Sequence, residues 1–271
     1  MSLFILIEKN HYLRYNNIDR EVVMQRYFIN EEDFFETYAY INGQDFHHIK
    51  NVMRMKENDN VSIIVNSNEY FCKIEKIEKN TVKVSIIKNI INNNELQVKI
   101  TIAHGLVRRE KMESVVKTIS EIGAYAYYPV IMQRSNIKLD KDKDFKMDRC
   151  KIIAKEASEL ANRVEITKVF QPISFTQLLA KSVFFDLCLV AYENENKYDS
   201  FKKSLDEFSG KNILMVIGPE GGIDEKEIIA FKNSNFKFVS LGKRILSTIT
   251  APVVATSILS FYFENGEKNE Y

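Results

Sequence analysis

The 271-residue chain has few cysteines, no excess of charge of either sign and no long hydrophobic run. Its three cysteines, Cys72, Cys150 and Cys188, lie far apart, and none belongs to a Cys-x-x-Cys pair. This spacing argues against a disulfide framework or a zinc site and favours a reducing compartment, so we expect a cytoplasmic protein without a metal. Because 38 Lys and Arg balance 37 Asp and Glu, the overall charge does not indicate nucleic acid as a partner.

The chain also lacks an obvious targeting or membrane segment. Its first apolar run covers only residues 3–7 and is followed by the acidic Glu8. That run is too short for the core of a signal peptide, and no segment reaches the roughly 18 apolar residues of a membrane span. We therefore expect no association with a membrane.

The chain divides into three zones. Residues 1–23 are polar after their apolar start, and we interpret them as an N-terminal extension, consistent with a misassigned start codon. Residues 24–92 are rich in β-branched runs separated by turn residues, which predicts strands at 61–65, 70–77 and 81–87. Strands this close together favour antiparallel pairing, so we expect a small β-barrel domain.

The third zone, residues 93–271, alternates strands with amphipathic helices. Strands are expected at 98–103, 187–191, 213–217 and 236–240, and helices at 109–122, 145–161 and 253–263. Gly123 stands where a helix over 109–122 would need a left-handed residue to end it. This alternation predicts an α/β domain with a parallel sheet covered by helices.

Two loops follow neighbouring apolar runs in this zone. The first reads Gly218-Pro-Glu-Gly-Gly222, where glycines permit positive φ and a close approach of the backbone to a ligand. Asp224 and Glu227 have the spacing of a capping box at the start of the next helix. The loop lacks the Gly-Lys-Ser/Thr ending of a phosphate-binding Walker A motif. A plain connection from strand to helix also fits this pattern.

The second loop reads Leu241-Gly-Lys-Arg-Ile-Leu-Ser-Thr-Ile-Thr250, and Thr250 is expected to cap the final helix. Ligands of open α/β sheets gather at the carboxyl ends of strands, so the two loops predict one pocket with two walls. The final helix is apolar on nearly every side. It is therefore either central in the core or part of a subunit interface.

Together these motifs resemble the RsmE family of 16S ribosomal RNA methyltransferases, which belong to the SPOUT class and methylate uridine N3. The Gly-Pro-Glu-Gly-Gly loop is followed, as in the family, by Leu-Gly-x-Arg-Ile-Leu-x-Thr-x-Thr-Ala. Three further segments match in the same order: His47-His48-Ile-Lys-Asn-Val-Met-Arg54, Lys111-Met-Glu to Glu-Ile-Gly123, and Glu156-Ala-Ser-Glu159 with Arg163. The resemblance covers nearly the whole chain from Met24 onward.

The resemblance implies a PUA-like RNA-binding domain, here residues 24–92, before a trefoil-knotted methyltransferase domain, here residues 93–271. It implies S-adenosylmethionine (SAM) as cofactor, 16S rRNA in the small ribosomal subunit as substrate, and a homodimer. The carried-over RNA contacts are Arg26, His48 and Arg54, and the strand end at 191–193 is a further candidate wall of the pocket. The carried-over cofactor residues are Ile217, Gly218, Pro219, Glu220, Gly221, Gly222, Leu241, Gly242, Arg244, Ile245, Leu246, Thr248 and Ala251.

The methyl of a sulfonium is already electrophilic, so the enzyme must mainly align the uridine N3 with the S–CH₃ bond. It must also stabilise the negative charge that develops on the uracil oxygens O2 and O4. Arg163 is the first candidate for the cationic group, and Glu159 lies on the same face if the helix extends that far. A solvated salt-bridge face explains the same spacing. No general base can be named.

The chain departs from the family pattern beside the expected methyl-transfer site. The cofactor loop usually reads Arg-Ile-Leu-Arg-Thr-Glu-Thr-Ala, but here Ser247 replaces the second Arg and Ile249 replaces the Glu. Leu160 stands where the family has Gln. Two alternatives to the family activity therefore stay open: a non-catalytic RNA-binding or ribosome-assembly factor on the same scaffold, and a methyltransferase with a shifted RNA target.

Overall fold

The structure, a computed structural model, describes residues 24–137, 146–192 and 199–265. The predicted extension at 1–23 and Glu193 of the proposed third wall lie outside these residues. The chain divides into two compact units, Met1–Asn92 and Asn93–Tyr271. Each unit is described below by itself.

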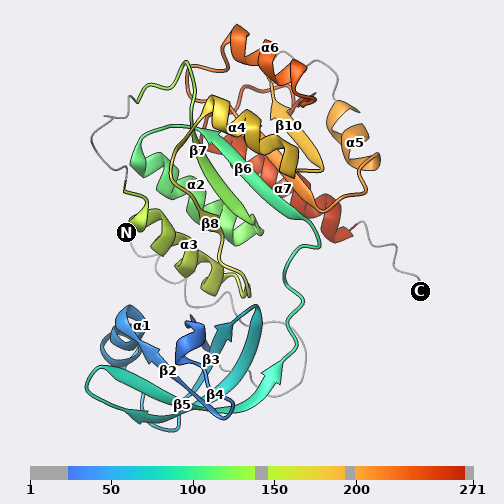
Figure 1. Cartoon of the computed structure of the whole chain (residues 1–271). Helices are drawn as coiled ribbons and strands as arrows, with labels where there is room; N and C mark the ends of the chain where they lie inside the picture. The colour runs from blue at the N-terminus through green and yellow to red at the C-terminus, as the bar shows by residue number, and fades with distance from the viewer. Residues whose placement is uncertain (1–23, 138–145, 193–198, 266–271) are drawn as a thin grey trace, which may run out of the picture. The chain divides into compact units, whose positions relative to one another are not determined.

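The first unit contains a curled five-stranded sheet with the strand order β1-β3-β4-β5-β2 (Figure 1). The expected antiparallel pairing is confirmed for β3 with β4 and for β4 with β5, whereas β1 runs parallel to β3. Its strands are β1 (Gln25–Phe28), β2 (Tyr38–Asn42), β3 (Asn60–Val65), β4 (Asn68–Ile77) and β5 (Thr81–Ile90). The helix α1 (Gly43–His47) continues into a π-turn, His48–Val52, which contributes the buried Ile49 to the core.

The second unit contains a parallel sheet with the order β12-β10-β11-β6-β7-β8, and β9 also pairs with β7. Its strands are β6 (Lys99–Gly105), β7 (Ala126–Ile131), β8 (Lys168–Val169), β9 (Ile173–Ser174), β10 (Leu187–Ala191), β11 (Asn212–Ile217) and β12 (Lys237–Val239). Its helices are α2 (Arg109–Ile122), α3 (Asp148–Leu160), α4 (Phe175–Lys181), α5 (Asp199–Asp206), α6 (Glu225–Asn233) and α7 (Thr250–Asn265). The predicted α/β class is confirmed.

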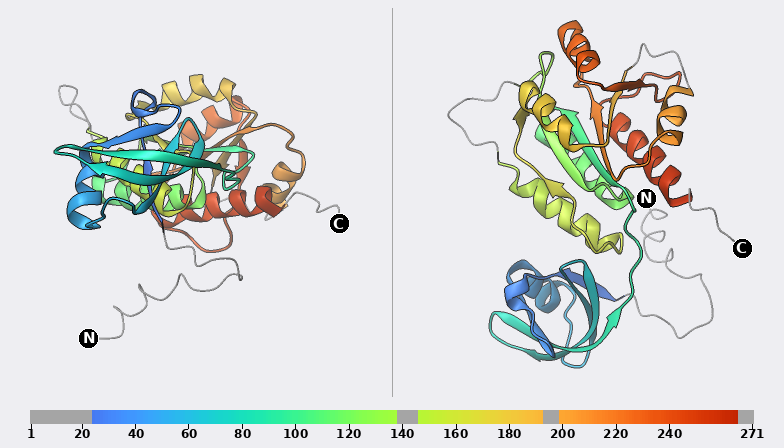
Figure 2. Two further views of the ribbon diagram at one scale, coloured as in Figure 1. Left: turned by 90° about the horizontal axis from the view of Figure 1, so that it is seen from below. Right: turned by 45° about the vertical axis from the view of Figure 1, so that its right-hand side comes forward.

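Helices cover both faces of this sheet (Figures 1 and 2). Side chains alternate across β11: Ile213 and Met215 join a core shared with α2, α3 and α7, whereas Leu214 and Val216 join a core shared with α4 and α6. Both sets are buried, so the strand reads as a continuous apolar run, as expected for a parallel sheet.

The predicted elements agree closely with the structure where periodicity was strong. The helix expected at 109–122 is α2, and Gly123 ends it with φ of 105°. The strand β7 was not predicted, because Pro129 argues against a central strand. The helix α4 was also missed, although Ser174 and Gln177 form a capping box that could have signalled it.

The described residues were compared with the requirements of a membrane-spanning helix and of a metal site. No helix among them is long and apolar enough to cross a membrane. In the same part of the chain, no group of three or more His, Cys, Asp or Glu side chains is arranged to hold a metal ion.

Candidate functional site

Two glycine-containing loops lie at one edge of the second unit's sheet. β11 ends at Ile217 and is followed by the loop 218–222, while β12 is followed by the segment 240–249. Since these strands are parallel, both loops leave the carboxyl edge of the sheet. The Thr248 hydroxyl donates to the carbonyl oxygen of Gly218 at 3.5 Å. The structure therefore brings the two loops together.

The segment 240–249 crosses the sheet edge. It starts beside the edge strand β12, and its Thr248 contacts His104 at the end of β6, which lies three strands away. The chain thus passes the ends of β10 and β11 before α7 begins at Thr250. The trefoil knot implied by the resemblance stays a prediction.

The first loop is held by close backbone contacts on two sides. A Cβ on Gly105 would lie 2.3 Å from the Pro219 nitrogen, and one on Gly221 would lie 2.9 Å from the Arg134 carbonyl oxygen. Gly222 adopts φ of 73° and its N–H donates to the Pro219 carbonyl at 2.9 Å, closing a tight turn. Glycine is required at 105 and 221 by proximity and at 222 by φ.

Polar side chains fix the outer side of this loop. Glu220 accepts hydrogen bonds from Lys111, on α2, and from the Asn136 amide at 2.8 Å. The bond from Lys111 holds the pKa of Glu220 below its ordinary value. Arg134 pairs with Asp224 at 3.4 Å, just after the loop. The Glu220 side chain is therefore held by residues of α2 and of the segment after β7.

The predicted capping box follows the loop. The Asp224 carboxylate accepts from the Lys226 N–H at 3.1 Å, and the Glu227 carboxylate accepts from the Asp224 N–H at 3.1 Å. Glu227, 6% exposed, also accepts from the Gln133 N–H at 2.8 Å. Glu227 therefore links the start of α6 to the segment after β7. This fixes the C-terminal end of the loop 218–222.

The second loop presents both exposed and packed residues. Gly242 has φ of 113°, and Arg244 and Ile245 are exposed, Ile245 by 87%. Leu241 and Leu246 are partly buried against the core, and Ala251 belongs to it at 8% exposure. The predicted cofactor residues of this loop therefore divide into an exposed turn at 242–245 and an apolar base.

The two departures from the family pattern have local structural roles. The Ser247 hydroxyl accepts from the Thr250 N–H at 3.2 Å, so Ser247 caps α7. The expectation that Thr250 would cap this helix is wrong, because Thr250 is already its first residue. Ile249 packs partly buried against the core. Serine and isoleucine at these positions thus stabilise the start of α7.

His104, at the end of β6, lies fully buried beneath the loops. Its Nδ1 lies 2.9 Å from the Tyr127 hydroxyl, and its Nε2 lies 2.7 Å from the Thr248 hydroxyl. Burial lowers the pKa of His104 to about 4 and raises that of Tyr127 well above its ordinary value. The imidazole is therefore neutral at neutral pH. The loops reach it from 144 residues away in sequence, so no local signal could have found this contact.

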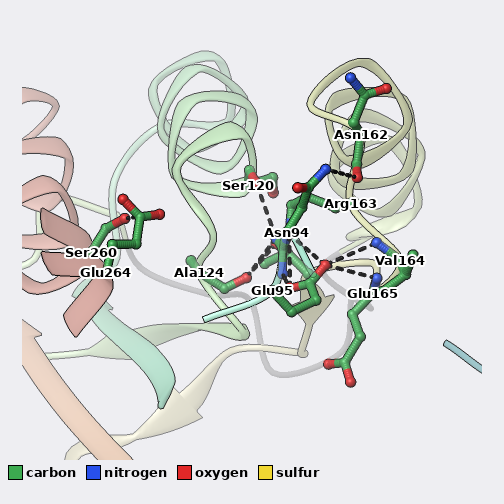
Figure 3. A network of polar contacts seen from close by, with 11 residues as sticks. Asn94, Glu95, Ser120, Ala124, Asn162, Arg163, Val164, Glu165, Ser260 and Glu264 are labelled. Atoms are coloured by element: carbon green, nitrogen blue, oxygen red, sulfur yellow. Dashed lines mark hydrogen bonds and ion pairs between the residues drawn. The ribbon is translucent and has the colours of Figure 1, made fainter. Parts of the chain in front are cut away.

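Arg163, the predicted catalytic cation, is bound within the protein at the other edge of the sheet (Figure 3). Its guanidinium donates to Glu95 at 2.8 Å, to the Ser120 and Ala124 carbonyls at 3.0 Å each, and to the Thr167 hydroxyl at 2.9 Å. Ala124 precedes β7, so this is the amino edge, opposite the loops. Arg163 is 3% exposed, and its guanidinium is bound by groups of its own unit, away from the two loops.

Glu159 is also away from the loops. The helix α3 ends at Leu160 and Asn162 adopts φ of 57°, so Glu159 and Arg163 do not share a helix face as predicted. Glu159 pairs with Lys155 at 3.5 Å, and its side chain is 16% exposed. The structure gives neither residue a place beside the loops.

The three predicted RNA contacts of the first unit differ in accessibility. Arg26 is 9% exposed, and its guanidinium donates to both carboxylate oxygens of Glu69, at 2.9 and 2.7 Å. It therefore forms a buried ion pair within the unit. His48 is half-buried, with Nδ1 3.0 Å from the Tyr27 hydroxyl, whereas Arg54 is exposed.

The proposed third wall is partly described. Ala191 ends β10, and the Tyr192 N–H donates to the Val239 carbonyl at 3.0 Å. The Tyr192 ring meets that of Phe238 at 5.6 Å between centroids. This strand end therefore lies at the same carboxyl edge as the two loops.

Comparison with known protein families gives two matches. Residues 94–260 match the model of an RNA methyltransferase domain, and residues 41–87 match that of an RNA methyltransferase PUA domain. The first match contains both loops, and the second contains His48 and Arg54.

Individual relatives match nearly the whole chain. The chain is 38% identical to ribosomal RNA small subunit methyltransferase E of Bacillus subtilis, covering 89% of this chain and 98% of the relative. It is 29% identical to the enzyme of that name from Mesomycoplasma hyopneumoniae, covering 85% and 96%. A putative methyltransferase from Legionella pneumophila, solved with bound SAM, matches at 27% identity and a TM-score of 0.78, covering 89% of this chain and 98% of that one.

Proposed function

Because this chain belongs to the RsmE family of ribosomal RNA small subunit methyltransferases, we propose that it methylates N3 of a uridine in 16S rRNA, with SAM as donor. The observation that carries the proposal is the junction of the two glycine loops at the carboxyl edge of the sheet. The function is expected in the cytoplasm, where the small ribosomal subunit is made.

The residues at this edge suit SAM. Backbone atoms of 218–222 and 241–246 can bind the adenine edge and the amino-acid part, because glycines lack a Cβ and so let a ligand approach the main chain. Gly242 in particular has no other atom within 4 Å of the position that a Cβ would take. Ile217 and Leu246 supply apolar surface. We assign the cofactor site to Ile217, Gly218, Pro219, Glu220, Gly221, Gly222, Leu241, Gly242, Arg244, Ile245, Leu246, Thr248 and Ala251, with Glu220 anchoring its loop through Lys111 and Asn136.

Positioning is the main contribution of the protein to the reaction. When bound, SAM supplies an electrophilic methyl on a sulfonium. The loops must hold this methyl in line with N3, and a cation must offset the charge on the uracil oxygens. Since Arg163 is buried at the opposite edge, we assign this cationic role to the exposed Arg244. The segment 240–249 that bears it is expected to thread a trefoil knot.

We propose that the first unit binds RNA through the surface around His48 and Arg54. Both residues follow α1, and the exposed Lys50 adds a second positive charge to this turn. Cationic side chains there can neutralise phosphates, the sequence-independent part of RNA affinity. Arg26 supports the unit from within through its pair with Glu69.

We further propose that α7 forms a homodimer interface. Most of this helix is buried in the core, but Val254, Ser257 and Phe261, spaced on one side, are half-exposed or exposed, Phe261 by 70%. Replacing Phe261 with Arg should shift the dimer toward monomer in analytical ultracentrifugation. A wild-type protein that is monomeric at micromolar concentration would contradict this proposal.

The activity is tested by methyl transfer from labelled SAM to small ribosomal subunits that lack N3-methyluridine, followed by mass mapping. A single modified uridine supports the proposal. Modification at another nucleotide supports a shifted target. SAM binding and RNA binding without any transfer would favour the non-catalytic alternative, for which Ser247 and Ile249 are the motivating residues.

A further inference from the structure

Four groups form a continuous chain of hydrogen bonds beneath the cofactor loops. The Tyr127 hydroxyl, the two ring nitrogens of His104, the Thr248 hydroxyl and the Gly218 carbonyl follow one another at 2.9, 2.7 and 3.5 Å. Tyr127 and His104 are fully buried on neighbouring strands, β7 and β6. This series of hydrogen bonds therefore extends from the core to the point where the two loops meet.

One arrangement of protons gives every hydrogen bond in this series one donor and one acceptor. The Gly218 carbonyl can only accept, so the Thr248 hydroxyl donates to it and accepts from Nε2–H of His104. Since the imidazole is neutral, Nδ1 then carries the lone pair and accepts from the Tyr127 hydroxyl. The opposite tautomer would leave the buried Tyr127 hydroxyl without an acceptor among these groups, which is unfavourable.

We propose that His104, held in the Nε2–H tautomer by Tyr127, is a positioning residue that aligns Thr248 and so fixes the separation of the two cofactor loops. The inference rests on the proposed SAM site. It adds that affinity for the cofactor depends on a buried imidazole that does not itself touch the ligand.

The hydrogen bonds of Thr248 matter because the two loops differ in how firmly they are held. The loop at 218–222 is already fixed against Gly105 and Arg134, whereas the crossing segment 240–249 has an exposed turn at 242–245. Thr248 is the member of that segment that hydrogen-bonds both to β6 and to the first loop. Loss of its hydroxyl should let the crossing segment move relative to the first loop.

The test measures SAM affinity by calorimetry for the wild type, Thr248→Val and Thr248→Ser. Val keeps the shape but removes the hydroxyl, and we expect SAM to bind on the order of tenfold more weakly, because a buried donor loses its partner. Ser restores the hydroxyl and should bind within about twofold of wild type on the same argument. Thr118→Val is a matched control, since its hydroxyl bonds only its own helix, at Ser114.

A second measurement does not depend on any variant. Long-range ¹H–¹⁵N spectra of the wild-type protein, with only four histidines in the chain, report the tautomer of His104 directly. We expect a neutral Nε2–H ring, and a change of its tautomer in Tyr127→Phe. An imidazolium or a Nδ1–H ring in the wild type would overturn the inference.

The results distinguish failure of this inference from failure of the proposed function on which it rests. A wild-type protein that binds no SAM would refute the proposed cofactor site itself. Wild-type binding with equal affinity in Thr248→Val would leave the function standing and refute the positioning role.

Discussion

The guanidinium of Arg163 lies 2.8 Å from the carboxylate of Glu95, a residue that follows the boundary between the two units by only three positions. On the other side of that boundary, the Asn92 amide donates to Glu69, which Arg26 holds in a second buried pair. Each unit therefore uses a buried arginine to fix its own end of the connecting segment. Both arginines, which the sequence predicts as ligand contacts, are bound to carboxylates of their own unit.

Replacing Arg163 with Met should destabilise the second unit without weakening SAM binding by the folded protein. Glu95 would lose its charged partner but keep hydrogen bonds from the Val164 and Glu165 N–H groups. Because Glu95 is also partly exposed, we expect a cost at or below the roughly 3–5 kcal/mol of breaking a fully buried pair. Urea unfolding and calorimetry with SAM measure the two effects. Lys155→Met, which breaks the more exposed pair with Glu159, should cost less than about 1 kcal/mol. Lost methyl transfer with unchanged stability would return Arg163 to the active site.

Arg26 and Arg54 should respond oppositely to replacement by Ala. Arg26→Ala removes a buried partner of Glu69 and should lower stability by about 3–5 kcal/mol. Arg54→Ala should leave stability nearly unchanged and weaken RNA binding, with a smaller dependence of affinity on salt. Lys79→Ala, at the exposed turn between β4 and β5, controls for simple loss of charge. Equal RNA affinity in Arg54→Ala and wild type would remove Arg54 from the interface.

Replacing Gly221 should disrupt SAM binding in proportion to side-chain size. A Cβ there would meet the Arg134 carbonyl at 2.9 Å, so Ala displaces the loop slightly and Val displaces it further. We expect weakened binding for Gly221→Ala and no measurable binding for Gly221→Val, with both proteins folded by circular dichroism. Unchanged SAM affinity in calorimetry would show that this loop is not part of the cofactor site.

Restoring the family residues at 247 and 249 should lower stability. Ser247→Arg removes the cap of α7, which costs about 1 kcal/mol, and Ile249→Glu places a charge against the apolar core. Thermal unfolding should therefore occur at a lower temperature in the double variant. If the departures weakened catalysis, its turnover should nevertheless rise. Unchanged turnover would mean that the site works with Ser247 and Ile249.

The buried His104 should make stability fall as the solution is acidified from about pH 6.5 toward 4. Its pKa is about 4 in the folded protein and 6.5 for the ordinary group, so the unfolded chain binds the proton more readily in this window. The slope is at most about 1.4 kcal/mol per pH unit for one proton. Urea unfolding of wild type and His104→Gln, compared between pH 5 and 6.5, isolates this term. Parallel curves would contradict it.

Part of the fold was predictable because it is local. The helix α2 could be predicted to the residue, since its apolar face repeats with helical period and Gly123 supplies the left-handed end. The strand β7 could not, because Pro129 is tolerated only through its place in the completed sheet. Ser247 and Ile249 were recognisable as departures, but their packing and capping roles depend on where α7 begins.

The amino-acid sequence by itself determined the α/β class, the two glycine loops and the family, because periodicity and motif spacing are properties of neighbouring residues. Only the tertiary structure decided which cations are available. Arg26 and Arg163 are buried against Glu69 and Glu95, while Arg54 and Arg244 stay exposed. The environment of a charge depends on residues tens of positions away in sequence, and desolvation favours a partner for every buried arginine.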